Sequence, residues 1–281
     1  MNIDEDLASK VIIKRKSESH KGNYGHLVLI GGNHNYGGAI IMAAESAVSS
    51  GAGLTVVATH SSNLSALHSR VPEAMFLDWR DNKLISLVKN ANVVLCGPGL
   101  GTDELALQLL TQVCSVVSED QTLILDASAL DLISQNINLI SKIKAGLVIL
   151  TPHQMEWQRV SKVKIPFQTD SANITALKQL FVKDNAILVL KSNKTHVYDT
   201  MKHVYVNTVG NPGMATGGMG DTLSGIIAAF VGQFGANLNS VLAAVYCHSK
   251  AGDIIYQDNY VVRPTEISAL MPNLMKRLSI K

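Results

Sequence analysis

The sequence predicts an α/β protein in which helices cover both faces of a mainly parallel β-sheet. Short apolar runs of strand length recur along the chain without alternating polar residues, which is typical of strands buried on both faces. Segments with helical periodicity lie between these runs, and strands that alternate with helices indicate a parallel sheet. The 281 residues contain no linker, repeat or low-complexity tract, so we expect a single domain over residues 1–281.

The predicted elements follow one another in the order that this fold requires. Six runs rich in Val, Ile and Leu are the expected strands: His26–Ile30, Leu54–Thr59, Asn92–Leu95, Thr122–Leu125, Leu147–Leu150 and Ile187–Leu190. The expected helices are Ala39–Ser50, Asp103–Val117, Ala172–Val182, Asp221–Val231, Val241–Tyr256 and, after a proline turn, Pro264–Leu278. The segment Thr195–Asn207 predicts a β-hairpin with Thr200–Lys202 near its turn.

The low charge of the chain bears on its partners. Charged residues make up only 16% of the sequence, against an average of about 25%, which indicates that much of the chain is interior or subunit interface. We therefore expect a homo-oligomer, such as a tetramer. The formal net charge is +2 and the longest basic run is Lys14–Lys16, so we expect no nucleic-acid partner.

The cysteines and the N-terminus favour a cytoplasmic protein. Cys96, Cys114 and Cys247 lie far apart in the sequence, so we expect free thiols in an apolar interior rather than disulfides or a zinc site. The acidic N-terminus is not followed by an apolar run of signal-peptide length. The segment Thr222–Ser249 contains no charged residue, but its polar interruptions around Gly235 indicate a loop between two buried helices, and we expect no membrane span.

Glycines and polar residues follow the predicted strands at their carboxyl ends. The segment Gly97–Gly101 follows one strand, Asp126 the next, and His153 and Lys191 lie just after the following two. Ligands of open α/β sheets bind outside the carboxyl ends of the strands, so we expect these residues to converge on one crevice. Both Gly97–Gly101 and the loop Gly31–Gly38 permit close backbone approach to a ligand, although each is also compatible with an ordinary turn.

The strongest local motif is the glycine-rich segment Asn211–Gly225. Its glycines lead directly into an apolar helix, so several backbone N–H groups can point at one anion on the helix axis. The expected anion loop consists of Gly217, Gly218, Met219 and Gly220. An aspartate at the first helical position, Asp221, would lie beside a bound phosphate as a base for a hydroxyl group. The alternative is that Asp221 is only an N-cap and that the glycines form only a flexible turn.

Two further residues suggest phosphate chemistry without a common nucleotide loop. Neither G-x-x-x-x-G-K-[ST] nor G-x-G-x-x-G occurs, which excludes the Walker and Rossmann motifs. Glu156, on the turn after a strand, could hold magnesium through water, although a solvated carboxylate at a helix start would look the same in sequence. Lys191 offers a cation for nucleotide phosphates at the rim of the crevice, or simply ends its strand.

Together these motifs resemble the ADP/ATP-dependent NAD(P)H-hydrate dehydratases, a ribokinase-like family also found as the carboxyl-terminal half of bifunctional NAD(P)HX repair enzymes. The resemblance covers nearly the whole chain, through Ser19–Gly22, Gly97–Gly101, Leu150–His153 and Asn211–Asp221. It implies a three-layer α/β/α sandwich. It also implies that NADHX and NADPHX, the hydrated cofactors, are returned to NADH and NADPH through a phosphorylated intermediate, with ADP or ATP consumed and phosphate and AMP or ADP released.

The resemblance also implies roles for individual residues. Ala39, Gly99 and His153 match the family's hydrate-binding positions, and Asp221 matches the aspartate at the reacting hydroxyl. The residues that match its nucleotide contacts are Lys191, Ser192, Asn193, Lys194, Thr195 and Gly220. On this basis Mg²⁺ near Glu156 is the expected cofactor, and ADP or ATP is the co-substrate.

Two departures and two alternative functions stay open at this point. Ser128 stands where the family usually repeats an aspartate, and Gln154–Met155 replaces a frequent Pro-Gly before Glu156. A ribokinase-like small-molecule kinase would share the glycine loop but stop at the phosphorylated product. A nucleotide-binding regulator without catalysis is the other alternative, against which the intact Asp221 argues. The sequence leaves the choice between ADP and ATP open, and likewise the choice between NADHX and NADPHX.

Overall fold

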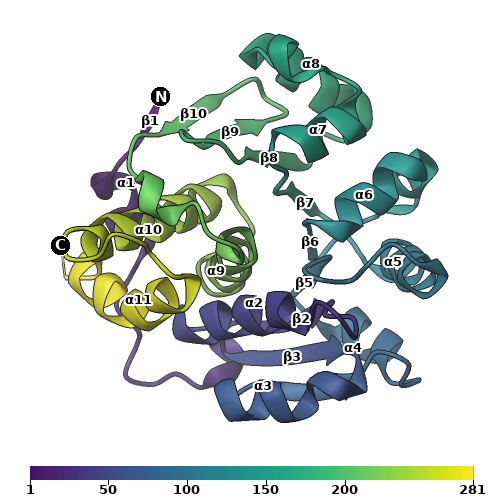
Figure 1. The fold of residues 1–281 in the computed structure, drawn as a ribbon, viewed down its shortest axis with the longest axis horizontal. Helices are drawn as coiled ribbons and strands as arrows, with labels where there is room; N and C mark the ends of the chain where they lie inside the picture. The colour runs from purple at the N-terminus through teal and green to yellow at the C-terminus, as the bar shows by residue number, and fades with distance from the viewer. Residues whose placement is uncertain (281) are drawn as a thin grey trace.

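A computed structural model describes residues 1–280 and contains a ten-stranded sheet between two layers of helices (Figure 1). The strand order is β1-β10-β9-β8-β7-β6-β5-β2-β3-β4. All pairings from β4 to β8 are parallel, whereas β9 is antiparallel to both of its neighbours. The mainly parallel α/β/α sandwich is therefore confirmed.

The strands have the short lengths expected of a sheet covered on both faces. Their bounds are Asn2–Ile3 (β1), His26–Ile30 (β2), Leu54–Thr59 (β3), Met75–Asp78 (β4), Val93–Cys96 (β5), Thr122–Leu125 (β6), Leu147–Leu150 (β7), Ala186–Leu190 (β8), His196–Asp199 (β9) and Val204–Asn207 (β10). The residues of β5, β6 and β8 are all buried, as their uninterrupted apolar sequences require.

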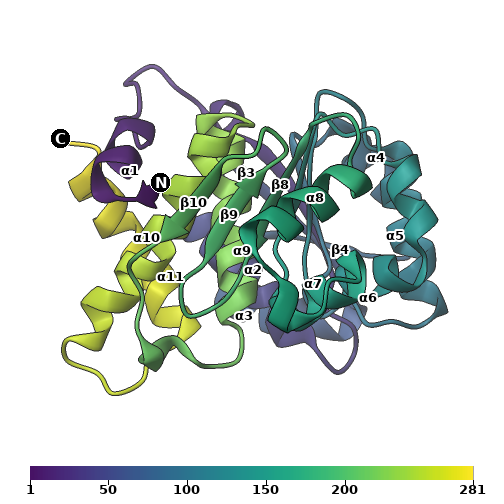
Figure 2. The same ribbon diagram turned by 90° about the horizontal axis from the view of Figure 1, so that it is seen from above.

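The helices divide between the two faces of the sheet (Figure 1). One layer contains α1 (Glu5–Val11), α2 (Gly37–Ser49), α3 (Leu64–Arg70), α9 (Met219–Phe234), α10 (Leu238–Tyr256) and α11 (Pro264–Leu278). The other contains α4 (Leu84–Asn90), α5 (Glu104–Val116), α6 (Ser128–Gln135), α7 (Gln154–Ser161) and α8 (Asp170–Leu180). The helix α1 packs on α10 and α11, which brings the two ends of the described chain to the same side of the molecule (Figure 2).

The predicted elements are all present, and the missed ones are short. Each of the six predicted strands forms within one residue of its expected bounds, the hairpin is β9 and β10, and the six predicted helices end within three residues of expectation. The sequence did not reveal β1, β4, α1, α3, α4, α6 or α7. None of these is longer than eight residues, so their hydrophobic periodicity is too brief to recognise and packing against the sheet determines them.

Two apolar clusters, one on each face of the sheet, form the core. The three cysteines are free and buried, as predicted. The uncharged segment Thr222–Ser249 consists of most of α9, a short turn and the first part of α10, which confirms the predicted loop between buried helices. Within residues 1–280, every helix falls short of the combined length and apolarity that crossing a bilayer requires.

The helices α2 and α9 pack tightly against each other and determine the geometry of the crevice at the carboxyl edge. Gly225 of α9 lies against α2 so closely that a Cβ there would come within 2.1 Å of the Ala43 carbonyl oxygen and 2.2 Å of Ser46 Oγ. Only glycine permits this approach. Because both helices begin at the carboxyl edge of the sheet, their contact sets the distance between their N-terminal ends.

Candidate active site

The loops that follow β2, β5, β6, β7 and β8 converge at the carboxyl edge of the sheet, as predicted. Backbone hydrogen bonds join neighbouring loops: Asn33 N donates to the Gly99 oxygen at 2.7 Å, and Lys191 N donates to the Pro152 oxygen at 2.8 Å. Such bonds satisfy backbone groups that would otherwise be orphaned beyond the ends of the strands. The crevice is therefore a set of mutually supported loops, in keeping with the position of ligand sites in α/β sheets.

The glycine-rich segment forms the N-terminus of α9, but the helix begins two residues earlier than predicted. Gly218, with φ of +91°, is the N-cap and provides no side-chain cap, and Met219 is the first helical residue. Asp221 is therefore the third residue of the helix and not the first. The interpretation of Asp221 as an N-cap is wrong, because its carboxylate is not used to close the helix. The free N–H groups of this first turn remain available to an anion.

A lysine whose side chain is 20% exposed joins the loops after β6 and β8. Lys191 Nζ donates a hydrogen bond to Asp126 Oδ1 at 2.9 Å, and the Asp126 side chain is only 1% exposed. Burial by itself would lower the pKa of Lys191, but the carboxylates of Asp126, Glu156 and Asp221 together raise it. Lys191 is thus a fixed cation at the centre of three carboxylates and does not merely end its strand.

The ionisation of Asp221 is tuned by the same cluster. Burial raises its pKa to about 6, and the negative charges of Asp126 and Glu156 act in the same direction, while Lys191 opposes them. A carboxylate with this pKa is ionised at neutral pH and is a stronger base than an ordinary aspartate. The geometry gives Asp221 the chemical property that the proposed base needs.

His153 and Glu156 form a reciprocal cap at the start of α7. His153 Nδ1 accepts from the backbone N–H of Glu156 at 3.2 Å, and Glu156 Oε2 accepts from the backbone N–H of His153 at 2.8 Å. Glu156 is 7% exposed, so the solvated carboxylate considered from sequence is not what forms. Burial raises its pKa, and Lys191 opposes this effect.

The donor set of the crevice fits a magnesium ion. Asp126 Oδ2 is buried and has no hydrogen-bond partner among residues 1–280, and Glu156 lies in the same charge cluster. Carboxylate oxygens are the protein ligands that Mg²⁺ prefers, and it usually takes only one or two of them together with water and substrate phosphates.

Two of the predicted substrate positions, Ala39 and Gly99, lie on the β5 and β2 side of the crevice, whereas His153 follows β7. Gly99 has φ of +62°, and a Cβ there would meet the Tyr36 carbonyl oxygen at 2.3 Å and Ala39 Cβ at 3.1 Å, so Gly99 and Ala39 are neighbours. Ser128 Oγ accepts a hydrogen bond from Gly101 N at 3.1 Å. The serine that replaces the family's usual aspartate thus holds the glycine loop Gly97–Gly101 in place.

The predicted nucleotide segment lies on the opposite side of Asp221. Lys191 pairs with His153 in an isolated parallel bridge, and Ser192, Asn193 and Lys194 form the exposed turn between β8 and β9. A Cβ on Gly220 would lie 3.0 Å from Lys191 Nζ, so the first turn of α9 directly contacts this lysine. The structure therefore brings together Lys191, Gly220 and Asp221, while Ser192, Asn193 and Lys194 are exposed.

The sequence placed Asp126 in the crevice without giving it a role, and it did not reveal His248 at all. Asp126 ends a buried strand, and the next residue, Ala127, has φ of +48°, a backbone conformation that non-glycine residues adopt mainly where function or packing demands it. His248 of α10 lies behind the anion loop, where its ring hydrogen-bonds the backbone of Met219 and burial lowers its pKa to about 4. A charged residue directly after an apolar strand was the one available signal for Asp126, whereas nothing in the helical pattern distinguishes His248.

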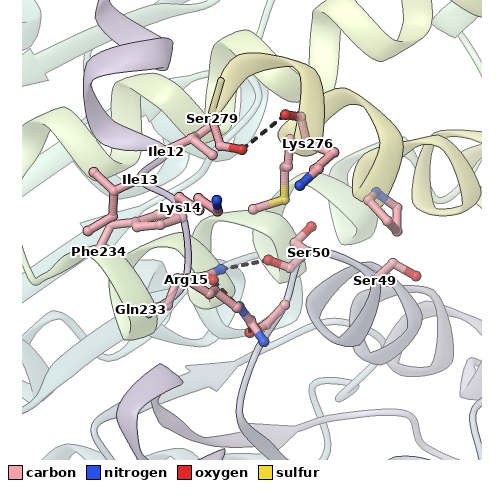
Figure 3. Close-up of a pocket in the computed structure, with 13 residues that line it drawn as sticks. Ile12, Ile13, Lys14, Arg15, Ser49, Ser50, Gln233, Phe234, Lys276 and Ser279 are labelled. Carbon is pink, nitrogen blue, oxygen red and sulfur yellow. Dashed lines mark hydrogen bonds between the residues drawn. The ribbon is translucent and has the colours of Figure 1, made fainter. Parts of the chain in front are cut away.

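A separate cavity of about 380 Å³ lies at the opposite, amino edge of the sheet (Figure 3). Lys14 and Lys276 reach toward it, and Arg15 donates to the Gly51 oxygen at 2.5 Å. The helices α2, α9 and α11 end here, and cations complement the partial negative charge of helix C-termini. None of the predicted site residues lines this cavity, so the candidate site is the crevice at the carboxyl edge.

The architecture of the sheet and its helices defines a class of fold. A ribokinase of Arabidopsis thaliana has the same fold, with a TM-score of 0.59 at 13% identity over 88% of this chain and 98% of its own. This likeness places the chain in the ribokinase-like class of folds, with Asp221 and a glycine-rich helix N-terminus at the carboxyl edge of the sheet.

Comparison with known proteins narrows this class to one family. Residues 27–273 match the carbohydrate-kinase-type family described as NAD(P)H-hydrate dehydratase. The ADP-dependent (S)-NAD(P)H-hydrate dehydratase of Lactiplantibacillus plantarum is 48% identical over 99% of this chain and 97% of its own. The crystal structure of the ADP/ATP-dependent NAD(P)H-hydrate dehydratase of Bacillus subtilis, co-crystallised with ATP and Mg²⁺, has a TM-score of 0.81 at 26% identity, over 99% and 98% of the two chains. The chain belongs to the NAD(P)H-hydrate dehydratase family.

Proposed function

We propose that this enzyme returns NADHX and NADPHX to NADH and NADPH by phosphorylating the ring hydroxyl with ADP and then eliminating phosphate. The observation that carries the proposal is the position of Asp221, a carboxylate with a raised pKa at the glycine-rich start of α9 and close to the Lys191 ammonium. The preference for ADP is supported by relatives that are 39–48% identical to this chain and are named ADP-dependent.

The chemistry follows from the hydroxyl group of the hydrated nicotinamide ring. Hydroxide is a poor leaving group, so the hydroxyl oxygen first attacks the terminal phosphorus of ADP, its proton passes to Asp221, and AMP departs. The ring nitrogen lone pair then expels phosphate from the adjacent carbon, and loss of a proton from the next carbon restores the ring double bond. The N–H groups at the start of α9 and the Lys191 ammonium stabilise the phosphoryl group during its transfer.

The other predicted residues have supporting roles in this scheme. Ala39 and Gly99 form a small-residue surface against which the hydrated ring packs, and His153 lies at the rim of the same crevice. Ser192–Thr195 hold the nucleotide, together with Gly220. Magnesium, held through water by Glu156, would neutralise the nucleotide phosphates. We assign these roles to one catalytic domain of a cytoplasmic enzyme.

The activity is tested by mixing the protein with NADHX, Mg²⁺ and either ADP or ATP and following the absorbance of the dihydronicotinamide ring. We expect the band to appear with ADP, with release of AMP and phosphate in equal amounts. Removal of Mg²⁺ by a chelator should lower the rate by at least tenfold, since the phosphate charges are then unshielded. Phosphorylated NADHX that accumulates without regaining absorbance would instead identify a kinase that stops at the phosphorylated product.

The low proportion of charged residues also predicts that the enzyme assembles into an oligomer. With 16% charged residues and exposed apolar side chains such as Tyr36 and Phe167, the chain should bury part of its surface against further copies. Light scattering at micromolar concentration should give a multiple of 30.2 kDa, such as four subunits. A mass of one chain under these conditions contradicts the proposal.

A further inference from the structure

A row of aromatic rings extends the crevice beyond the predicted substrate positions. His34, His60 and Trp79 follow β2, β3 and β4, which are neighbours at the end of the sheet. The His34 and His60 rings lie 5.5 Å apart at 72°, and the His60 and Trp79 rings 6.1 Å apart at 82°, so each pair meets edge to face. Nothing in the chemistry assigned to Asp221 and Lys191 uses these rings.

The row begins next to the proposed substrate site. His34 lies in the loop that joins β2 to α2, and this loop contacts Gly99 through the Asn33 hydrogen bond and the Tyr36 carbonyl. Adjacent strands lie about 4.8 Å apart, so the end of β3 is roughly 10 Å along the carboxyl edge from the end of β5. Because Lys191 and the β8–β9 turn take the co-substrate on the other side of Asp221, the remainder of a long substrate has to extend toward β3 and β4.

The imidazole rings present exposed ring surface and a ring nitrogen that can bind a ligand. His34 is exposed and His60 half-buried, whereas Trp79 is 5% exposed and supports His60 from the core side. His60 Nδ1 contacts Ser62, at 3.2 Å from its backbone N and 2.8 Å from its Oγ. The other ring nitrogen, Nε2, has no hydrogen-bond partner within residues 1–280 and is available to a ligand.

We propose that His34 and His60, supported by Trp79, form the subsite for the adenosine half of the dinucleotide substrate, with the adenine base stacked on one imidazole ring and in edge contact with the other. Purine bases stack on aromatic side chains irrespective of hydrogen-bond pattern, and a dinucleotide presents one such base at the end remote from the reacting ring. This assignment rests on the proposed function, because it takes the hydrated nicotinamide to lie at Asp221. It makes the row a specificity element that recognises dinucleotides in preference to mononucleotides.

The test compares the double variant His34→Ala/His60→Ala with the parent enzyme on two substrates. For NADHX we expect KM to rise about tenfold, which is within the range of base–aromatic stacking, with kcat and the KM for ADP unchanged. For the hydrated form of reduced nicotinamide mononucleotide, which lacks adenosine, KM should not change. The matched control is His68→Ala, which removes another exposed histidine with an edge contact to an aromatic ring, 6.5 Å from Phe76, away from the row.

A binding measurement separates this proposal from the reaction itself. Titration of the protein with NADH, followed by dihydronicotinamide fluorescence, should show about tenfold weaker binding in the double variant and no change for reduced nicotinamide mononucleotide. Equal weakening for both ligands would mean that the rings only shape the β2–α2 loop, and unchanged NADH binding would mean that adenosine lies elsewhere; either result overturns the subsite. Absence of turnover in the parent enzyme, with these binding differences intact, would contradict the proposed function alone.

Discussion

Replacement of Asp221 by asparagine should lower kcat by about 10²–10⁴-fold, the usual effect of losing a general base. The asparagine has nearly the same size but cannot accept the hydroxyl proton during phosphoryl transfer. Nucleotide affinity should be retained or rise slightly, since a negative charge near the phosphates is removed. Retention of more than about a tenth of the parent kcat by a folded variant would place the base elsewhere in the crevice.

The pH dependence provides an independent check of the same residue. The pKa of Asp221 is raised to about 6, so in the parent enzyme kcat should increase as the pH rises through 6 and the carboxylate ionises. This limb should be absent from the Asp221→Asn profile. The raised pKa also means that ionised Asp221 costs stability above pH 6, because the folded state holds its proton more tightly than the unfolded chain. The variant should therefore have an equal or higher Tm at pH 7.5, measured by calorimetry.

Replacement of Gly220 by valine should lower kcat/KM for ADP by at least about 10²-fold, comparable to removing a transition-state donor. The new Cβ would lie 3.0 Å from Lys191 Nζ, and this lysine cannot retreat without lengthening its 2.9 Å hydrogen bond to Asp126. Displacement of Lys191 removes the fixed cation, and the bulk of valine also covers the N–H groups at the start of α9. Both effects weaken nucleotide binding, which calorimetric titration with ADP would measure.

The matched control for this variant is Gly38→Val. Gly38 is the second residue of α2, as Gly220 is of α9, but no atom lies within 4 Å of its Cβ position. It therefore reports the general cost of valine in the first turn of a helix. Unchanged ADP affinity in folded Gly220→Val protein would show that the glycine-rich turn does not bind phosphate.

Strands and long helices could be predicted because their apolar residues have to face a core, whatever the rest of the chain does. The glycine-rich segment and Asp221 were also recognisable, since so many glycines in one loop are costly unless a close approach requires them. The start of α9 was misplaced because the helix begins inside the glycine-rich segment, where its N-cap, Gly218, provides no side-chain cap that the sequence could reveal.

The charge pairing within the crevice, between Lys191 and the carboxylates around it, could not be predicted for a related reason. Asp126 and Lys191 are 65 residues apart, and they meet because β6, β7 and β8 are consecutive in the sheet. Strand order follows from the packing of the whole chain and not from any segment of it. Glu156 is comparable: its spacing from His153 is that of a capping pair, but its burial depends on Lys191 and Asp126 facing it.

The close contact at Gly225 fixes the distance between α2 and α9 at the candidate active site. The first turn of α2 contains Ala39, beside the proposed position of the hydrated ring. The first turn of α9 contains Asp221 and belongs to the turn proposed to bind phosphate. Any side chain at residue 225 would increase the distance between α2 and α9 by pushing the helices apart. On the proposed mechanism, the separation between the acceptor hydroxyl and the donor phosphate is therefore set in the buried interior, about one helical turn from Ala39 and Asp221. Variation at the rim of the crevice can then alter which molecules enter without altering this distance.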